Sequence, residues 1–592
     1  MFSQTKLSKL LLIAVLAVVT AMLSVACSSG DDDVDSGSAA PATSVPAAAA
    51  AAAPTSAPAA APTSAPAAAT AVPAAMEPLI KRVVTAFEAP SLEGNETRHI
   101  GQTTMWQMKP IYEYLIDMDP VTGEMLPGLA LEWAVEDGPQ VRFKLREGIQ
   151  FQKGWGEFTA ADVVFTLKNH QREDSLHGEV IYFINVTPEA IAVNDHEVII
   201  KLSQNNSNFF AQTARHQGGM EIISKKHLES AGDPVVIGQD EPIVGTGSYQ
   251  YLERAQSQNI VFERTPDHWR ITPDFQELEI KFINEASTRQ AGLLTEEIHI
   301  TNLPEDQLVE AVKAGFKVAT GNVTALRAFA QFRGQYELES HATSNGYQDN
   351  GSPFLDVRVR QALNQAINRD EVNSAFFGGK GSLMQVNHLN PGRLGWNPRW
   401  EAEFESKYGF DTNAAKALLE EAGYNSGNPL EIDVQVAPIS RYASADDIME
   451  VLAGYWRDIG VKVNQYTQDN AIRRAKGRAF EYTREIAMGG TSSNITIGPK
   501  VYNTSFPPRG GGVEILESSK IMGEFIQTLD PVKADALARR MGDIFFDEFI
   551  GIPLFWLPAE AVINSKFVSD WVWPGAITGT WTHMENIKAV KK

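Results

Sequence analysis

The amino-acid sequence predicts an α/β protein with two or three lobes behind an N-terminal targeting segment. The chain has 592 residues, and the stretch 77–592 is long enough to divide into lobes that each bury a sizeable core. Strand-type and helix-type patterns alternate along that stretch, which is typical of α/β proteins.

A helix is expected over 101–114. A hairpin, a strand and a capped helix are then expected between Ile111 and Leu167. The turn Asp119–Gly123 combines a proline, which fixes φ, with a glycine, which permits positive φ. In Val141–Arg146 apolar and cationic residues alternate, as expected for a strand with one solvated face. Thr159 lies three residues before Asp162, and this spacing predicts a capping box at the start of a helix.

Two later helices are predicted by their caps. Asp356 precedes a segment whose apolar residues recur at helical spacing, and Asp411 begins a second helix that should end at Gly423. Arg358 and Arg360 in the first of these helices could suggest a phosphate site, but structural ion pairs are the expectation in this context.

The first 76 residues predict export and anchoring. Residues 1–26 combine two lysines with an apolar run, as in a signal peptide. Cys27 is the only cysteine, and its place after small residues resembles a bacterial lipobox, in which the cysteine becomes the lipidated N-terminus. An ordinary signal peptide with an incidental cysteine is the alternative. Residues 27–76, rich in Ala, Pro, Ser and Thr, are expected to form a tether.

Charge and motif content exclude several function classes. The formal net charge of −22 argues against nucleic acid and against an anionic membrane surface as partners. The sequence has no zinc-protease, serine-hydrolase or phosphate-loop motif and no cysteine pair. His299 has no second histidine at ligand spacing, so no metal site is expected. We therefore predict neither an enzyme nor a cofactor.

Several sequence blocks resemble extracellular solute-binding protein family 5 of ABC importers, the dipeptide-, oligopeptide- and nickel-binding group. The blocks are IYEYL, LPGLALEW, FKLREGIQF and FTAADVVFTL between Ile111 and Leu167, PIVGTGSY at 242–249, and the helix that follows Ser352. The resemblance implies a two-lobed periplasmic-binding-protein-like fold of type II, with an extra subdomain in the N-terminal lobe. It also implies a set of boundaries: lobe I at 77–112, 225–325 and 552–592, the inserted subdomain II at 113–224, and lobe III at 326–551.

The resemblance further implies that a small solute, most simply a peptide or peptide-like molecule, is trapped between the lobes and delivered to the permease subunits of an ABC importer. The protein is expected to act as a monomer, lipid-anchored on the outer face of the cytoplasmic membrane, in a periplasmic or extracellular location. The ligand-binding candidates are Asn95, Trp106, Trp396, Arg441, Tyr442 and Ser492.

One departure from the family pattern leaves the solute open. Peptide-binding members place an aspartate near the segment from Ile486 to Ile497, where it captures the amino group of the peptide, and this chain has none there. The alternatives are a secreted carbohydrate-active protein, either an oligosaccharide-binding component or a glycosidase acting through two carboxylates, and a tethered adhesion protein.

Overall fold

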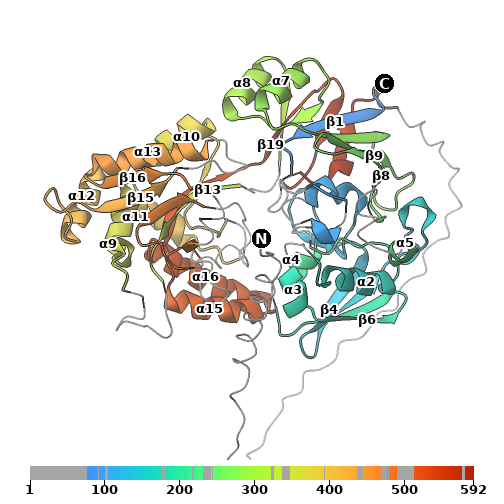
Figure 1. Ribbon diagram of the computed structural model, residues 1–592, viewed down its shortest axis with the longest axis horizontal. Coiled ribbons are helices and arrows are strands. Elements are labelled where there is room, and N and C mark those ends of the chain that lie inside the picture. The colour runs from blue at the N-terminus through green and yellow to red at the C-terminus, as the bar shows by residue number, and fades with distance from the viewer. Residues whose placement is uncertain are drawn as a thin grey trace, which may run out of the picture. The chain divides into compact units, whose positions relative to one another are not determined.

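The computed structural model describes residues 77–592, all within one compact unit, Ala74–Lys592. The description leaves out 91–92, 96, 101–104, 176–179, 207–208, 216–218, 231–241, 243, 322–325, 337–346, 348, 392–393, 437–443, 469–471, 473–475, 478, 490–511 and 576–580. Strands and helices alternate along the described chain, so the predicted α/β class is confirmed (Figure 1). None of the helices in the described part combines the length and apolar character needed to cross a membrane.

A seven-stranded mixed sheet organises the first part of the fold. Its central strand, β1, runs parallel to both neighbours, and the strands farther out join antiparallel. In spatial order the strands are β12 (Lys317–Thr320), β19 (Glu560–Ile563), β11 (Ile300–Thr301), β1 (Arg82–Phe87), β10 (Glu277–Phe282), β9 (Asn259–Arg264) and β8 (Tyr249–Ala255). Two helices, α7 (Ala286–Leu294) and α8 (Glu305–Lys313), pack on this sheet through Leu293, Leu308 and Val562.

A four-stranded antiparallel sheet forms a separate layer with its own core. Its strands, in order, are β4 (Ala130–Glu136), β5 (Gln140–Leu145), β7 (Glu197–Lys201) and β6 (Glu189–Asn194). The hairpin β2 (Ile116–Met118) and β3 (Met125–Pro127) precedes it, and the helices of this region are α2 (Ala160–His170), α3 (Val180–Asn185), α4 (Phe209–Thr213) and α5 (Lys225–Ser230).

The local predictions for this region are confirmed. Gly123 has φ 72°, and the Asp119 carboxylate accepts hydrogen bonds from two backbone N–H groups of the turn. Alternate residues of β5 are buried, and Thr159 with Asp162 forms the capping box of α2.

A six-stranded sheet carries the last part of the fold. Its strands, in order, are β14 (Ser382–Leu383), β18 (Gly551–Leu557), β13 (Leu326–Arg333), β17 (Glu485–Met488), β15 (Glu431–Gln435) and β16 (Lys462–Tyr466). Its helices are α9 (Val357–Gln365), α10 (Arg369–Phe377), α11 (Arg399–Tyr408), α12 (Thr412–Glu421), α13 (Ala445–Asp458), α15 (Leu516–Gln527) and α16 (Pro531–Asp547).

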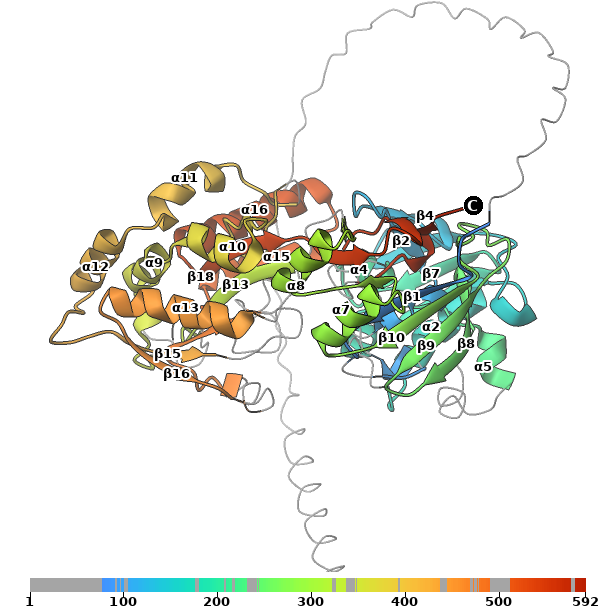
Figure 2. The ribbon, with the colours of Figure 1, turned by 90° about the horizontal axis from the view of Figure 1, so that it is seen from above.

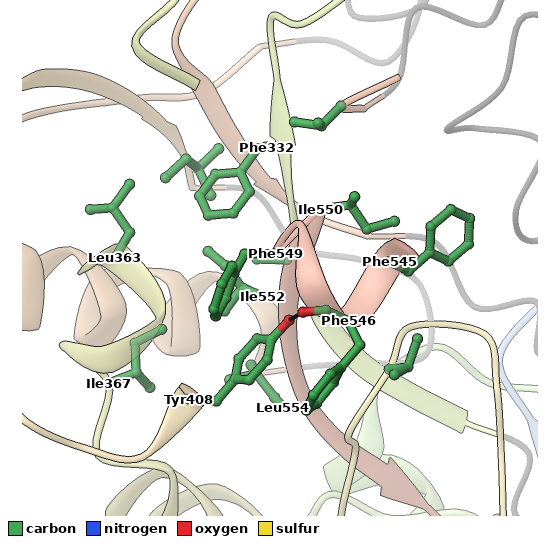
Figure 3. Packing of buried hydrophobic residues seen from close by; sticks show 14 of the residues in the cluster. Phe332, Leu363, Ile367, Tyr408, Phe545, Phe546, Phe549, Ile550, Ile552 and Leu554 are labelled. Atoms are coloured by element: carbon green, nitrogen blue, oxygen red, sulfur yellow. Dashed lines mark hydrogen bonds between the residues drawn. The ribbon is translucent and has the colours of Figure 1, made fainter. Parts of the chain in front are cut away.

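One continuous hydrophobic core joins these helices to the sheet. Figure 3 shows its centre, where Phe332 and Ile552 from neighbouring strands pack with Leu363 of α9 and Phe546 of α16. The Tyr408 hydroxyl donates to the Phe546 carbonyl at 2.7 Å, so α11 and α16 are also joined by a hydrogen bond within the core.

The predicted helix caps and arginine roles are confirmed here. The side chains of Asp356 and Asp411 accept from backbone N–H groups at the starts of α9 and α12. Arg358 pairs with Asp356 at 2.6 Å, and Arg360 pairs with Glu548 at 3.0 Å. Both arginines therefore serve the fold rather than a phosphate site.

The chain passes twice between the seven- and six-stranded sheets, from β12 to β13 and from β18 to β19. Figure 2 shows β13 and β18 in one part of the molecule and β1, β8, β9 and β10 in the other. Strand β12 pairs with β19 in one sheet and β13 pairs with β18 in the other, so the strands that flank the two crossings are neighbours in both sheets. The Gly321 N–H also donates to the Ala559 carbonyl at 2.8 Å, which ties one crossing to the other. Strand β18 lies in the six-stranded sheet, so the change of sheet follows Leu557 and not the expected boundary at residue 552.

A predicted helix from Gly101 to Tyr114 is wrong for the part that the structure describes. Two short 3-10 turns, Met105–Gln107 and Lys109–Ile111, replace it, and Tyr112 is already extended. Pro110 explains the break, because its ring prevents a regular helix from continuing through this position.

Candidate functional site

The two faces of the six-stranded sheet differ in chemistry. Along β13, Ala328, Ala330 and Phe332 belong to the hydrophobic core beneath the helices. Successive strand residues point to opposite faces, so Arg327, Phe329, Gln331 and Arg333 line the other face. All four are at most 6% exposed. This second face is therefore buried and yet rich in polar and cationic groups, which is unusual for a structural core.

A cluster of five residues lies on this face where the strands leave for the seven-stranded sheet. We call it the crossing cluster, and it consists of Arg327, Phe329, Met384, His388 and Trp556. Arg327 lies opposite Trp556 in the pairing of β13 with β18, and its guanidinium is 4.6 Å from the centre of the Phe329 ring. His388 Nδ1 shares a hydrogen bond with Arg327 and its ring lies 5.6 Å from that of Phe329. The cluster thus combines a cation with aromatic walls.

One buried polar atom of this cluster, and one of the residue that follows Met384 in the chain, lack a hydrogen-bond partner among the described residues. They are the indole Nε1 of Trp556, a residue 1% exposed, and Oε1 of Gln385, a residue 8% exposed. A buried donor without a partner costs about 1–3 kcal/mol. An ordered water or a bound molecule is the usual partner of such a group, so these two atoms can serve a ligand that reaches them.

The absence of a side chain at Gly489 leaves the space that the ring of Phe329 occupies. The Gly489 N–H donates to the Phe329 carbonyl at 2.9 Å, which brings the two backbones together. A Cβ at this position would lie only 2.1 Å from Cζ of Phe329. Any side chain here would therefore displace the aromatic wall that packs against Arg327.

A buried ion pair extends the polar face away from the crossings. Arg333 and Glu485 face each other on β13 and β17, form a salt bridge, and are 4% and 3% exposed at their side chains. Burial raises the pKa of the Glu485 carboxyl to about 7, although Arg333 acts in the opposite direction. The carboxyl of this pair therefore titrates near neutral pH.

A second buried charge cluster joins four residues that are far apart in the sequence, namely Asp117, Arg215, Arg270 and Glu585. Arg215 contacts Glu585 at 2.7 Å and Asp117 at 3.5 Å, and Arg270 contacts Glu585 at 3.1 Å. The His583 Nε2–H donates to the Met118 carbonyl oxygen at 3.1 Å, and burial, together with the nearby charge of Arg215, lowers the pKa of His583 to about 3. Every carboxylate here has an arginine partner, so we assign this cluster to stability.

The candidates named from the sequence fall in different parts of the fold. Asn95 is 3% exposed, and its Oδ1 accepts from Arg254 Nε at 2.8 Å. Trp106 is 6% exposed and packs edge-to-face against Phe87 at 5.9 Å. Trp396 is half-buried and packs edge-on against a second tryptophan beside the core of the six-stranded sheet. Arg441, Tyr442, Ser492 and Cys27 lie outside the described residues. A binding role for these candidates stays a prediction.

His299 has a structural contact. Its Nδ1 accepts a hydrogen bond from the Val84 N–H at 2.9 Å, just before β11, and burial lowers its pKa to about 4. No group of three or more potential metal ligands occurs within the described ranges of the chain.

Sequence reasoning missed the crossing cluster. A signal was present in β13, where Arg327 interrupts an apolar run, but Trp556 lies within the apolar run of β18 and does not stand out. Nothing in the sequence, however, showed that these two residues would be opposite each other.

Comparison with solved structures supports the two-lobed fold. The chain superposes on HbpA2 from Haemophilus parasuis with a TM-score of 0.69 at 20% identity, covering 86% of this chain and 100% of that one. The periplasmic binding protein DppA from Helicobacter pylori, solved with the peptide STSA, gives a TM-score of 0.65 at 19% identity, covering 86% of this chain and 98% of that one. The predicted periplasmic-binding-protein fold is thus confirmed.

Sequence comparison points the same way. The dipeptide-binding protein of Escherichia coli K12 is 27% identical over 408 residues, which cover 65% of this chain and 71% of that protein. Heme-binding protein A of Haemophilus influenzae is 27% identical over 399 residues, covering 64% of this chain and 68% of that protein. The family model of the bacterial extracellular solute-binding proteins, family 5 Middle, matches residues 124–512. The chain belongs to the bacterial extracellular solute-binding proteins of family 5, which capture a solute and deliver it to an ABC importer.

Proposed function

We propose that this protein captures a short peptide or a peptide-like molecule between its two lobes and passes it to the permease subunits of an ABC importer. Relatives in both comparisons support the solute class, since one is a dipeptide-binding protein and one was solved with a tetrapeptide. Other relatives bind heme or were solved with Fe(III)-EDTA, so the solute has to be argued from this chain. We further propose that the protein works as a monomer anchored through Cys27, with residues 27–76 as its tether.

The crossing cluster is the observation that carries the peptide proposal. Its Trp556 N–H is a buried donor with no partner among the described residues, and Arg327 lies opposite it on the neighbouring strand. A peptide offers backbone carbonyls that accept from an indole N–H and a terminal carboxylate that favours a cationic neighbour. A neutral oligosaccharide offers no carboxylate, so the arginine gives it no advantage.

Closure of the two lobes is the proposed mechanism. Arg327, Phe329 and Trp556 of the cluster lie on β13 and β18, the two strands of the six-stranded sheet that adjoin the crossings, so a solute bound there would contact the part of the fold about which we propose that the lobes rotate. Solute binding then shifts the population toward the closed form, which the importer recognises.

The test is a thermal-shift screen of protein stripped of co-purified solute, followed by titration of a Trp556→Phe variant. The panel contains di- to pentapeptides, hemin, an iron chelate and oligosaccharides. Peptides are expected to raise the melting temperature, because a ligand at about a hundredfold excess over Kd stabilises the native state by about 2.7 kcal/mol. Loss of the indole N–H should then weaken peptide affinity about 5- to 30-fold, the equivalent of one hydrogen bond.

The Trp556→Phe variant keeps an aromatic ring in the wall, so its melting temperature without solute should stay close to that of the wild type. Trp400→Phe is the matched control, because Trp400 is also fully buried but its Nε1 donates to Asp543 at 2.9 Å. That variant should lose stability and keep its affinity. A response to oligosaccharides alone would instead support the carbohydrate-active alternative.

A further inference from the structure

The turn between α10 and β14 is held rigidly on the six-stranded side of the molecule. Gly378 and Gly379 both have positive φ, at 57° and 76°. The Asn373 side chain accepts from the Gly381 N–H at 2.9 Å and donates to the Gly381 carbonyl at 2.9 Å. This pair of hydrogen bonds fixes the backbone after Lys380, and the Gly379 N–H, which donates to the Asn373 carbonyl at 3.1 Å, fixes it before Lys380. The turn therefore sets the direction of the Lys380 side chain.

Lys380 reaches from this turn to two carboxylates of the other lobe. Its Nζ lies 2.8 Å from Oε2 of Glu305, in the first turn of α8, and 3.1 Å from Oε2 of Glu560, the first residue of β19. The three side chains are 34%, 28% and 20% exposed, so solvent screens these pairs only in part. Burial lowers the pKa of Lys380, but the hydrogen bonds to Glu305 and Glu560 outweigh this effect and raise it.

The bridge lies beside the crossings. Glu560 begins β19 immediately after one crossing, and Ser382, two residues after Lys380, pairs with Trp556 just before it. Gly378 makes the close approach possible, because a Cβ there would be 2.9 Å from Oε1 of Glu305. Any rotation of the lobes about the crossings would therefore change the separation of Lys380 from its two partners.

We propose that Lys380 is an electrostatic strap that holds the two lobes in the arrangement described here and so sets their equilibrium before any solute binds. This inference rests on the proposed closure of the lobes, and it adds a regulatory contact outside the crossing cluster. Since the strap is an ion pair, its contribution should fall as the salt concentration rises.

Single-molecule energy transfer on the full chain without solute tests this proposal. Cys27 is the only cysteine, so Cys27→Ser gives a cysteine-free background for labelling. Lys416→Cys on α12 and Lys588→Cys on β21 (Ile587–Ala589) then place one exposed label on each lobe. Lys380→Met should lower the population of the arrangement described here, relative to the other arrangements, about two- to fivefold. This is the size expected for two partly exposed ion pairs.

Further variants separate the strap from a general charge effect. Lys380→Arg should keep the wild-type distribution, and adding Glu305→Gln to Lys380→Met should change nothing more, because the partners act as a unit. About a tenfold rise in salt concentration shortens the Debye length about threefold. The distance distribution of the wild type should then approach that of Lys380→Met, and the distribution of Lys380→Met itself should not change. Lys313→Met is the control, since Lys313 is an exposed lysine of α8 for which the described residues supply no ion pair.

The proposal is overturned if the Lys380→Met and wild-type distributions superimpose at both salt concentrations. It is also overturned if Lys313→Met shifts the distribution as much as Lys380→Met does. No solute is present in this experiment, so its outcome is separate from the choice of solute class.

Discussion

Replacing Arg215 by methionine is expected to lower the free energy of unfolding by about 3–5 kcal/mol. Arg215 contacts Glu585 and Asp117, and the side chains of these three residues are 4%, 2% and 13% exposed. Burial alone raises the pKa of the Glu585 carboxyl, but Arg215 and Arg270 outweigh burial and hold it well below its ordinary value. Removing Arg215 leaves buried negative charge without its main partner. Chemical denaturation followed by tryptophan fluorescence measures the loss.

Arg358→Met is the matched control for this prediction. Arg358 also pairs with an aspartate, at 2.6 Å, but its side chain is 44% exposed and that of Asp356 is 31% exposed. An exposed pair of this kind contributes about 1 kcal/mol or less. If Arg215→Met were no more destabilising than Arg358→Met, the assignment of this buried cluster to stability would be wrong.

Gly489→Ala is expected to destabilise the fold by about 1–3 kcal/mol and to weaken solute affinity about tenfold or more. The added Cβ would lie 2.1 Å from Cζ of Phe329, whose backbone is held by a hydrogen bond to Gly489 itself, so the ring has to move. Phe329 packs against Arg327 and Trp556, and the displacement therefore reaches the proposed binding surface. Thermal unfolding and titration with peptides measure the two effects.

Gly454→Ala makes the same chemical change where nothing lies within 4 Å of the added Cβ, in the middle of α13. That variant should be neutral or more stable by up to about 1 kcal/mol, because alanine favours a helix over glycine. Combining Gly489→Ala with Phe329→Ala should cost less than the sum of the single changes, since the clash disappears. Strict additivity would show that the ring of Phe329 is not what limits this position.

Local features of the fold could be predicted from the sequence because short-range chemistry determines them. The turn at Asp119 and the caps at Thr159, Asp356 and Asp411 each depend on residues at most four positions apart. The helix expected over 101–114 does not form in the described part of that segment, because the ring of Pro110 prevents a regular helix there despite the apolar residues around it. The apolar run of β18 could be recognised as a strand, but its composition does not say which of the two sheets it joins.

The candidate site could not be predicted in the same way. Arg327 and Trp556 are neighbours only because β13 and β18 pair, and that pairing depends on the topology of the whole lobe. Met384 and His388 reach the same place from the segment after β14. Asn95 was a candidate because it is a polar loop residue. The sequence did not indicate that its side-chain oxygen would accept a hydrogen bond from Arg254.

The most direct test of lobe closure around a peptide is the distance between labels at Lys416→Cys and Lys588→Cys, measured before and after a saturating dipeptide is added to solute-free protein. Dipeptide is expected to shift the population to a single, more closed arrangement, and Trp556→Phe is expected to need about 5- to 30-fold more dipeptide for the same shift. An unchanged distance distribution with every peptide, together with a shift produced by an oligosaccharide, would contradict lobe closure around a peptide.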